Sequence, residues 1–255
     1  MVPSRAVSAR GCDRTVTASN ETTQSTTSLL FLADLRRVLA EDGCPLCHLR
    51  RQADERYLRS VLREGAMDAG LLDRLLSSGG FCREHTWRLV RLEEDEEHDA
   101  LTNVIILQPL VEAALEELAA LSERRRRGER GEKRRRGVVA ACPACEARRQ
   151  LEVIFASELM QALTLPDIAE RFRSRRQGLC RDHFRQAWAA AADAEVRQLL
   201  REAQVAQVET LRTDLSEYVR KHKHQYRDEP AGREQDSHRR AAELLAGLPD
   251  DECTI

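Results

Sequence analysis

The chain contains the same arrangement of cysteines and histidines twice. CPLC at residues 44–47 and GFCREH at 80–85 form the first copy, and CPAC at 142–145 and GLCRDH at 178–183 form the second. One offset of 98 residues superimposes every cysteine, the proline, the glycine and the histidine without an insertion. Such a match at a fixed period indicates an internal duplication, so we expect two related halves.

The residue types in each copy are those that bind zinc. Two cysteines three residues apart on a turn direct both sulfurs at one ion, and the proline between them stiffens the turn. Cysteine and histidine three apart share a face of a helix. We therefore expect one structural zinc ion per repeat, two in all, each in a closed Cys3His set. The metal ligands are Cys44, Cys47, Cys82 and His85 in the first repeat and Cys142, Cys145, Cys180 and His183 in the second.

Other arrangements of these ligands stay open. The sequence does not exclude pairing between the copies, in which Cys44 and Cys47 share an ion with Cys180 and His183. Redox-active CxxC motifs follow a β-strand, and no strand pattern precedes either motif in this sequence. Iron–sulfur clusters usually have four cysteine ligands, whereas each copy here offers three cysteines and one histidine. Disulfides would leave the histidines unexplained. His48 adjoins Cys47, but the second copy has a glutamate at that position, so a shared site does not need it.

Three sulfurs and one neutral imidazole around a zinc ion leave a net negative charge. Helix N-termini can offset this charge, since they carry a partial positive charge. Arginines that recur beside the ligands in both copies could contribute, although arginines on solvated helix faces would give the same pattern. These arginines are Arg50, Arg51, Arg83, Arg148, Arg149 and Arg181.

The composition predicts an all-α protein. Aromatic residues make up only 4% of the chain, while alanine, leucine, arginine and glutamate dominate, as is typical of helices with aliphatic seams. Long amphipathic helices are expected at about 99–126 and 193–221, and they should pack on each other or across a dimer to bury their apolar stripes. Pro109 should kink the first of them.

The pattern along the chain divides it into five segments. A serine- and threonine-rich tail is expected to be disordered, and an arginine-rich linker separates the repeats. The acidic run at 93–97 is expected to form a solvated turn. A short helix is expected at 241–246. The segments are a tail at 1–28, a first helical zinc-binding repeat at 29–122, the linker at 123–137, a second repeat at 138–223 and a polar tail at 224–255.

Function is less constrained than fold. A net charge of −2 argues against a general nucleic-acid binder, and the linker has no aromatic residues for base stacking. No apolar run is long enough to span a membrane. The sequence also contains no recognisable Ser/His/Asp set, phosphate-binding loop or open metal site. We expect a cytoplasmic structural or interaction protein, not an enzyme, with a protein partner or a homodimer. The alternatives are a zinc-linked thiol switch and nucleic-acid binding through the linker.

The paired motifs also carry a resemblance. CPLC with GFCREH and CPAC with GLCRDH resemble an uncharacterised bacterial family that has paired CPxC and G(F/L)CxxH motifs. The resemblance covers about residues 29–222. It implies a helical, metal-binding cytoplasmic protein, and it implies no catalytic residue.

Overall fold

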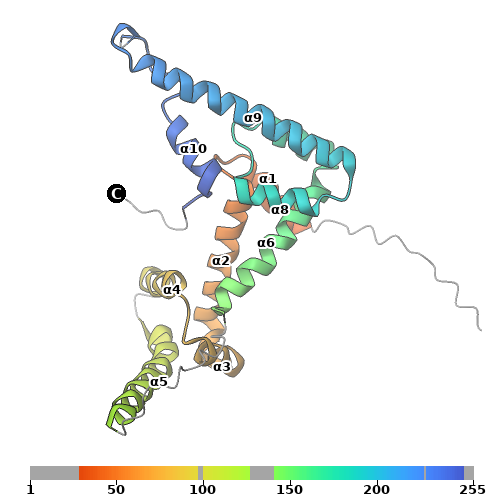
Figure 1. Ribbon diagram of the computed structural model, residues 1–255. Coiled ribbons are helices and arrows are strands. Elements are labelled where there is room, and N and C mark those ends of the chain that lie inside the picture. The colour runs from red at the N-terminus through yellow and green to blue at the C-terminus, as the bar shows by residue number, and fades with distance from the viewer. Residues whose placement is uncertain (1–28, 97–99, 127–140, 227, 250–255) are drawn as a thin grey trace, which may run out of the picture.

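The computed structural model describes residues 29–96, 100–126, 141–226 and 228–249, and within these ranges all regular structure is helical (Figure 1). The expected all-α class is therefore confirmed. The predicted N-terminal tail, most of the linker, Cys12 and Cys253 lie outside the described residues.

The duplication is visible in the order of the helices. The first repeat supplies α2 to α5 and the second supplies their counterparts α6 to α9, while α1 and α10 have no counterpart among the described residues. The elements are α1 Leu29–Val38, α2 Pro45–Glu64, η1 Gly65–Met67, α3 Ala69–Ser78, α4 Arg83–Glu96, α5 Leu101–Arg126, α6 Pro143–Ala162, α7 Pro166–Ser174, α8 Arg181–Ala190, α9 Ala194–Lys221, η2 His224–Tyr226 and α10 Ser237–Ala246.

The repeated motifs set the helix boundaries. Cys44 and Cys142 are the N-cap residues of α2 and α6, and the proline that follows each of them occupies the first turn, where its missing N–H costs no hydrogen bond. Gly79 ends α3 in the left-handed conformation, with φ 71°, which glycine adopts without steric cost. The chain therefore turns sharply just before Cys82.

Helices α2 and α6 pack side by side and run in opposite directions. Arg50 near the start of α2 lies 3.8 Å from Glu152, and Asp54, one turn further along, lies 3.7 Å from Arg148. Residue numbers therefore rise along α2 in the direction in which they fall along α6, so the two helices are antiparallel. The N-termini of α2 and α6, with their CPxC motifs, consequently lie at opposite ends of the pair (Figure 1).

Each end of this pair has its own hydrophobic core. The larger core surrounds the start of α2 and takes side chains from α1, α6, α7, α8 and α9, among them Leu35, Leu159 and Phe172. The smaller core surrounds the start of α6 and includes Leu58 and Leu75. Helix α1 contributes Phe31, Leu32, Leu35 and Val38 to the larger core, and the smaller core has no corresponding helix among the described residues.

The two long helices pack on different neighbours within the chain. Helix α9 packs on α7 and α10, whereas α5 packs on α3, α4 and η1. Helix α5 continues through Pro109 to Arg126. In Figure 1 the two helices lie towards opposite ends of the α2–α6 pair.

The interpretation of the acidic run as a solvated turn is wrong for its first residue. Glu93 is 1% exposed and belongs to α4. Its carboxylate accepts hydrogen bonds from the backbone N–H groups of Thr102 and Asn103, at 2.8 and 2.9 Å. The first amides of a helix have no partner within the helix, so Glu93 supplies one and fixes the start of α5.

Helix α10 is longer than the expected segment 241–246, and it packs on α9 and α8. A buried ion pair anchors it: Arg240 Nη2 lies 2.8 Å from Asp214 Oδ2 of α9, and both side chains are 4% exposed. Arg233 reaches the other oxygen of Asp214 at 2.7 Å. The segment predicted as a polar tail therefore contains a helix that is anchored to α9.

Candidate metal centres

The eight predicted ligands form two clusters, but each cluster combines the two repeats. The first, here called the buried cluster, consists of Cys44, Cys47, Cys180 and His183. The second, the half-exposed cluster, consists of Cys82, His85, Cys142 and Cys145. Within each cluster all ligand atoms lie within 4.8 Å of one another. The expectation that each repeat closes its own site is thus wrong, and the crosswise alternative describes the arrangement.

The length of α2 explains why each cluster combines ligands from both repeats. Helix α2 has 20 residues and at 1.5 Å per residue spans about 30 Å. Cys44 and Cys47 stand at its first turn, whereas Cys82 follows α3, which packs near the far end of α2 by way of η1. With 10 residues, or about 15 Å, α3 is too short to return the chain to the start of α2. The antiparallel partner α6 brings the other repeat there instead.

The buried cluster has the dimensions of a tetrahedral site. The Nδ1 atom of His183 lies 3.4, 3.3 and 3.2 Å from the sulfurs of Cys44, Cys47 and Cys180. The sulfurs of Cys47 and Cys180 are 3.8 Å apart. Two thiolates bound to one zinc ion at about 2.3 Å in a tetrahedron are roughly 3.8 Å apart. All four side chains are buried.

The half-exposed cluster has similar distances and a different environment. His85 Nδ1 lies 3.1, 3.7 and 3.4 Å from the sulfurs of Cys82, Cys142 and Cys145, and the sulfurs of Cys82 and Cys145 are 3.6 Å apart. His85 is fully buried, but the three cysteines are only partly buried. Solvent therefore reaches the sulfur side of this cluster.

Helix N-termini face both clusters. Cys44 and Cys142 cap α2 and α6, Cys180 caps α8, and Cys82 directly precedes α4. Each cluster thus lies at the starts of two helices, whose partial positive charge stabilises thiolates. Of the recurring arginines, Arg50 and Arg148 pair with Glu152 and Asp54.

In the half-exposed cluster, the protonation equilibria favour one thiolate, that of Cys142, beside a protonated His85. Burial raises the pKa of Cys142, but hydrogen bonds from His85 and from the backbone amides of Cys145 and Cys82 lower it to about 6. Burial lowers the pKa of His85, but the nearby carboxylate of Asp54 and hydrogen bonds with Cys142 and Cys82 raise it to about 10. Without a metal, the cluster holds a thiolate beside an imidazolium, which shows that it favours positive charge at its centre.

Loop residues and α10 enclose the buried cluster. A Cβ atom on Gly247, directly after α10, would lie 3.2 Å from the sulfur of Cys47 and 3.8 Å from that of Cys180. Leu248 packs against the larger core. The end of α10 thus covers the sulfurs, and the half-exposed cluster has no equivalent of α10 among the described residues.

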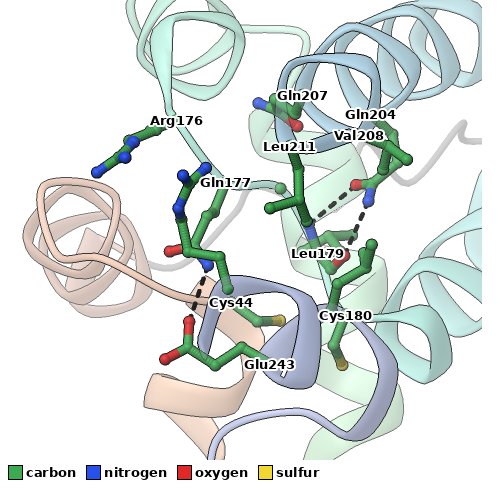
Figure 2. Close-up of a pocket in the computed structure, with 13 residues that line it drawn as sticks. Cys44, Arg176, Gln177, Leu179, Cys180, Gln204, Gln207, Val208, Leu211 and Glu243 are labelled. Atoms are coloured by element: carbon green, nitrogen blue, oxygen red, sulfur yellow. Dashed lines mark hydrogen bonds between the residues drawn. The ribbon is translucent and has the colours of Figure 1, made fainter. Parts of the chain in front are cut away.

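A pair of glutamines holds the loop that carries Cys180. Figure 2 shows that the side-chain amide of Gln204 accepts from the N–H of Leu179 and donates to its carbonyl oxygen, both at 2.9 Å. The side chain of Gln177 accepts from the backbone N–H of Gly43 and donates to Glu243 of α10, both at 2.8 Å. A Cβ on Gly178 would overlap the side-chain oxygens of Gln204 and Gln207, so a larger residue here would displace the glutamines that hold the loop.

Buried charges surround the half-exposed cluster. Asp54 of α2 is 3% exposed, and its Oδ2 lies 3.8 Å from Nε2 of His85, 3.5 Å from Arg88 and 3.7 Å from Arg148. A carboxylate on the far nitrogen of a ligating histidine fixes the ring orientation and the tautomer. Arg148 also lies 3.3 Å from Glu84. Asp54 therefore places a negative charge between His85 and the two arginines, on the side of the ring away from the sulfurs.

Sequence reasoning missed these supporting residues for one reason. Asp54, Gln204 and Gly247 lie away from the motifs, and their counterparts at the offset are a different residue or belong to no repeat. His48 was correctly set aside. Its ring nitrogens contact the carbonyl oxygen of Asp42 at 2.6 Å and Glu41 at 3.0 Å.

The fold and the clusters define a class: an all-helical protein whose two repeats exchange Cys/His ligand pairs, giving two Cys3His-type clusters that could each hold a metal ion. The chain belongs to the family of unknown function DUF6062, which it matches over residues 34–252. No curated protein and no solved structure matches the chain. Among the described residues, no helix is both long enough and apolar enough to span a membrane.

Proposed function

We propose that each cluster binds one zinc ion and that the two ions join the repeats into a rigid helical scaffold for protein–protein interaction. The crosswise pairing of closed Cys3His sets carries this proposal. Three sulfurs and one imidazole favour zinc over harder cations, and they complete a tetrahedron, so a bound ion retains no position for substrate. The proposal therefore assigns no catalytic role to the clusters.

The surroundings of the ligands support a structural role. The buried cluster belongs to the larger core, so its ion would stabilise the packing of α2 against α8. Reduced thiolates require a reducing compartment, and we accordingly place the protein in the cytoplasm. Metal binding would contribute to folding, because the ligands come together only in the folded chain.

Counting zinc in paired variants tests both the metal and the crosswise arrangement. Purified without chelator, the full chain should contain two zinc ions. Cys47→Ser with Cys180→Ser alters one cluster and should leave one ion. Cys47→Ser with Cys82→Ser alters both clusters and should leave none.

The two double variants are matched, since each removes two sulfurs. Ligand sets confined to one repeat would give the reverse pattern, with no zinc in the first variant and one ion in the second. Absence of zinc from the unaltered protein would refute the proposal as a whole.

A second candidate function is a zinc-linked thiol switch, and the exposure of Cys82, Cys142 and Cys145 favours it at the half-exposed cluster alone. A peroxide would take two electrons from two of these thiolates, which would form a disulfide while zinc is released. Mild peroxide treatment should then release one zinc ion per chain and leave the buried cluster loaded. Equal release from both clusters would exclude a switch specific to this site.

A further inference from the structure

The outer face of α5 carries a coiled-coil pattern. Val104, Gln108, Val111, Leu115 and Leu118 follow one another at intervals of four, three, four and three residues, which is the spacing of the a and d positions in a heptad. The four apolar side chains are 55%, 57%, 61% and 63% exposed. We call these five residues the α5 seam.

The α5 seam is separate from the face that α5 packs against its own chain. Asn103 and Ile106 make the inward contacts and are 4% and 0% exposed. The neighbours of α5 are α2, α3, α4 and η1, and every residue at 111–119 is exposed. In Figure 1 the far part of α5 extends away from the other described helices. The seam is therefore not part of either hydrophobic core.

The second repeat shows that the fold does not require an apolar seam. At the offset of 98 residues, the seam corresponds to Glu202, Ala206, Glu209, Thr213 and Ser216 of α9, and all five are exposed. The same face of the duplicated helix is thus polar where it meets solvent. Apolar residues on a solvated face are unfavourable unless another surface covers them.

We propose that the α5 seam pairs in parallel with the α5 seam of a second copy of this chain. In a parallel pair each a position faces its own counterpart, so Gln108 would meet Gln108. The amide of Gln108 donates to Glu112 of its own helix at 3.0 Å, and since an amide has two N–H donors and an accepting oxygen, it can also bond to its counterpart in the pair. This inference rests on the interaction role proposed above and names the partner.

The charges beside the seam agree with self-association. Leu107 and Ala114, at the g positions beside the seam, are apolar. Glu112 occupies an e position, and in a parallel pair it faces Leu107 of the other copy. Pro109 and Glu116 lie on the outer side of the pair. Between Val104 and Leu118 no like-charged side chains meet in this register, so this part of the two helices approaches without repulsion.

Sedimentation of the full zinc-loaded chain tests the pairing. The unaltered protein should be a dimer at about 10 μM. Leu115→Glu places two carboxylates in the seam and should weaken the dimer by about 100-fold or more, giving a monomer. The matched control Thr213→Glu alters the corresponding position of α9 and should leave the dimer intact. A dimer that persists in Leu115→Glu, or that is lost equally in Thr213→Glu, would overturn the inference.

The position of Gln108 supplies a test of the register. Gln108→Glu and Gln108→Lys should each be monomeric alone and should form a mixed dimer when combined, because opposite charges then meet. Failure of the mixture to pair would overturn the parallel register. Zinc content is measured throughout: a monomeric unaltered protein with two zinc ions would refute the pairing alone, whereas loss of zinc would refute the scaffold proposal.

Discussion

Replacing Gly247 tests whether α10 seals the buried cluster. Gly247 has φ 80° and ψ 179°, a region of backbone conformation that is essentially restricted to glycine. An alanine there costs about 2 kcal/mol in backbone strain. Its Cβ would also approach the sulfur of Cys47 to 3.2 Å, closer than ordinary van der Waals contact. Since a zinc-bound sulfur is held in place, the end of α10 must move instead.

The expected consequences of Gly247→Ala are a loss of stability and a faster loss of metal. A decrease of about 2 kcal/mol in unfolding free energy lowers Tm by roughly 4–8 °C in a chain of this size. If the strain is relieved when α10 detaches, the detached population rises by up to about 30-fold. Zinc release from the buried cluster to a colorimetric chelator should accelerate by a similar factor.

Gly79→Ala is the matched control. Gly79 also has a positive φ, 71°, but a Cβ there would have no heavy atom within 4 Å. This substitution should cost roughly 1 kcal/mol in strain without changing zinc release from the buried cluster. Release from Gly247→Ala within about 2-fold of the control would contradict the role of α10 as a cover.

Three further predictions concern charged groups. Asp54→Asn should destabilise the protein by about 3 kcal/mol, because it removes the buried carboxylate that lies 3.5 Å from the largely buried Arg88; denaturant unfolding measures this, and a change below about 1 kcal/mol would contradict it. Glu93→Gln should weaken the capping of α5 by about 1 kcal/mol and accelerate hydrogen exchange at its first amides; unchanged exchange would show that the cap contributes nothing. Burial and the thiol of Cys82 raise the pKa of Cys145 to about 12, and the pKa of His85 is about 10, so both hold a proton at pH 7 in the metal-free protein. Zinc must displace at least these two protons, and its affinity for the half-exposed cluster should therefore fall at least about 100-fold for each unit by which pH is lowered below 7, measured by competition with a chelator; an affinity independent of pH would refute this.

The sequence was sufficient to predict the helices and the eight clustered side chains, because both follow from local patterns. Cysteine spacing places two sulfurs on one turn, and apolar periodicity marks the buried face of a helix. The partner of each ligand pair could not be predicted, since an exact repeat supports pairing within a repeat and between repeats equally well. The distance between the two ends of α2 decides the question, and that distance depends on where the helices end and pack.

The supporting residues were beyond prediction for a different reason. Glu93 lies in an acidic run that has the composition of a solvated turn, and only the position of α5 shows that its carboxylate meets free amides. Gly247 lies in a segment without a repeat counterpart, and only the packing of α10 brings it to the sulfurs. Both contacts depend on tertiary structure, which overrides the local pattern.

The exchange of ligands follows from helix length and only weakly from chain entropy. An ion that joins Cys47 to Cys180 closes a loop of 133 residues, whereas Cys47 and Cys82 of one repeat are 35 residues apart. Loop entropy grows with the logarithm of length, so the longer loop restrains the unfolded chain by only about 1 kcal/mol more. For Cys82 and Cys145, 63 residues apart, the corresponding gain is about 0.5 kcal/mol.

These gains are small beside the cost of the alternative. A site closed within one repeat would require α2 to break in its middle, which would forfeit interior hydrogen bonds and the packing of Leu58 in its core. Burial of one leucine alone contributes about 2 kcal/mol. His85 lies beside Asp54, which is about 15 Å along α2 from Cys44. An unbroken α2 therefore keeps the two ligand pairs of its own repeat apart, and each pair reaches a complete set of four ligands only through the other repeat.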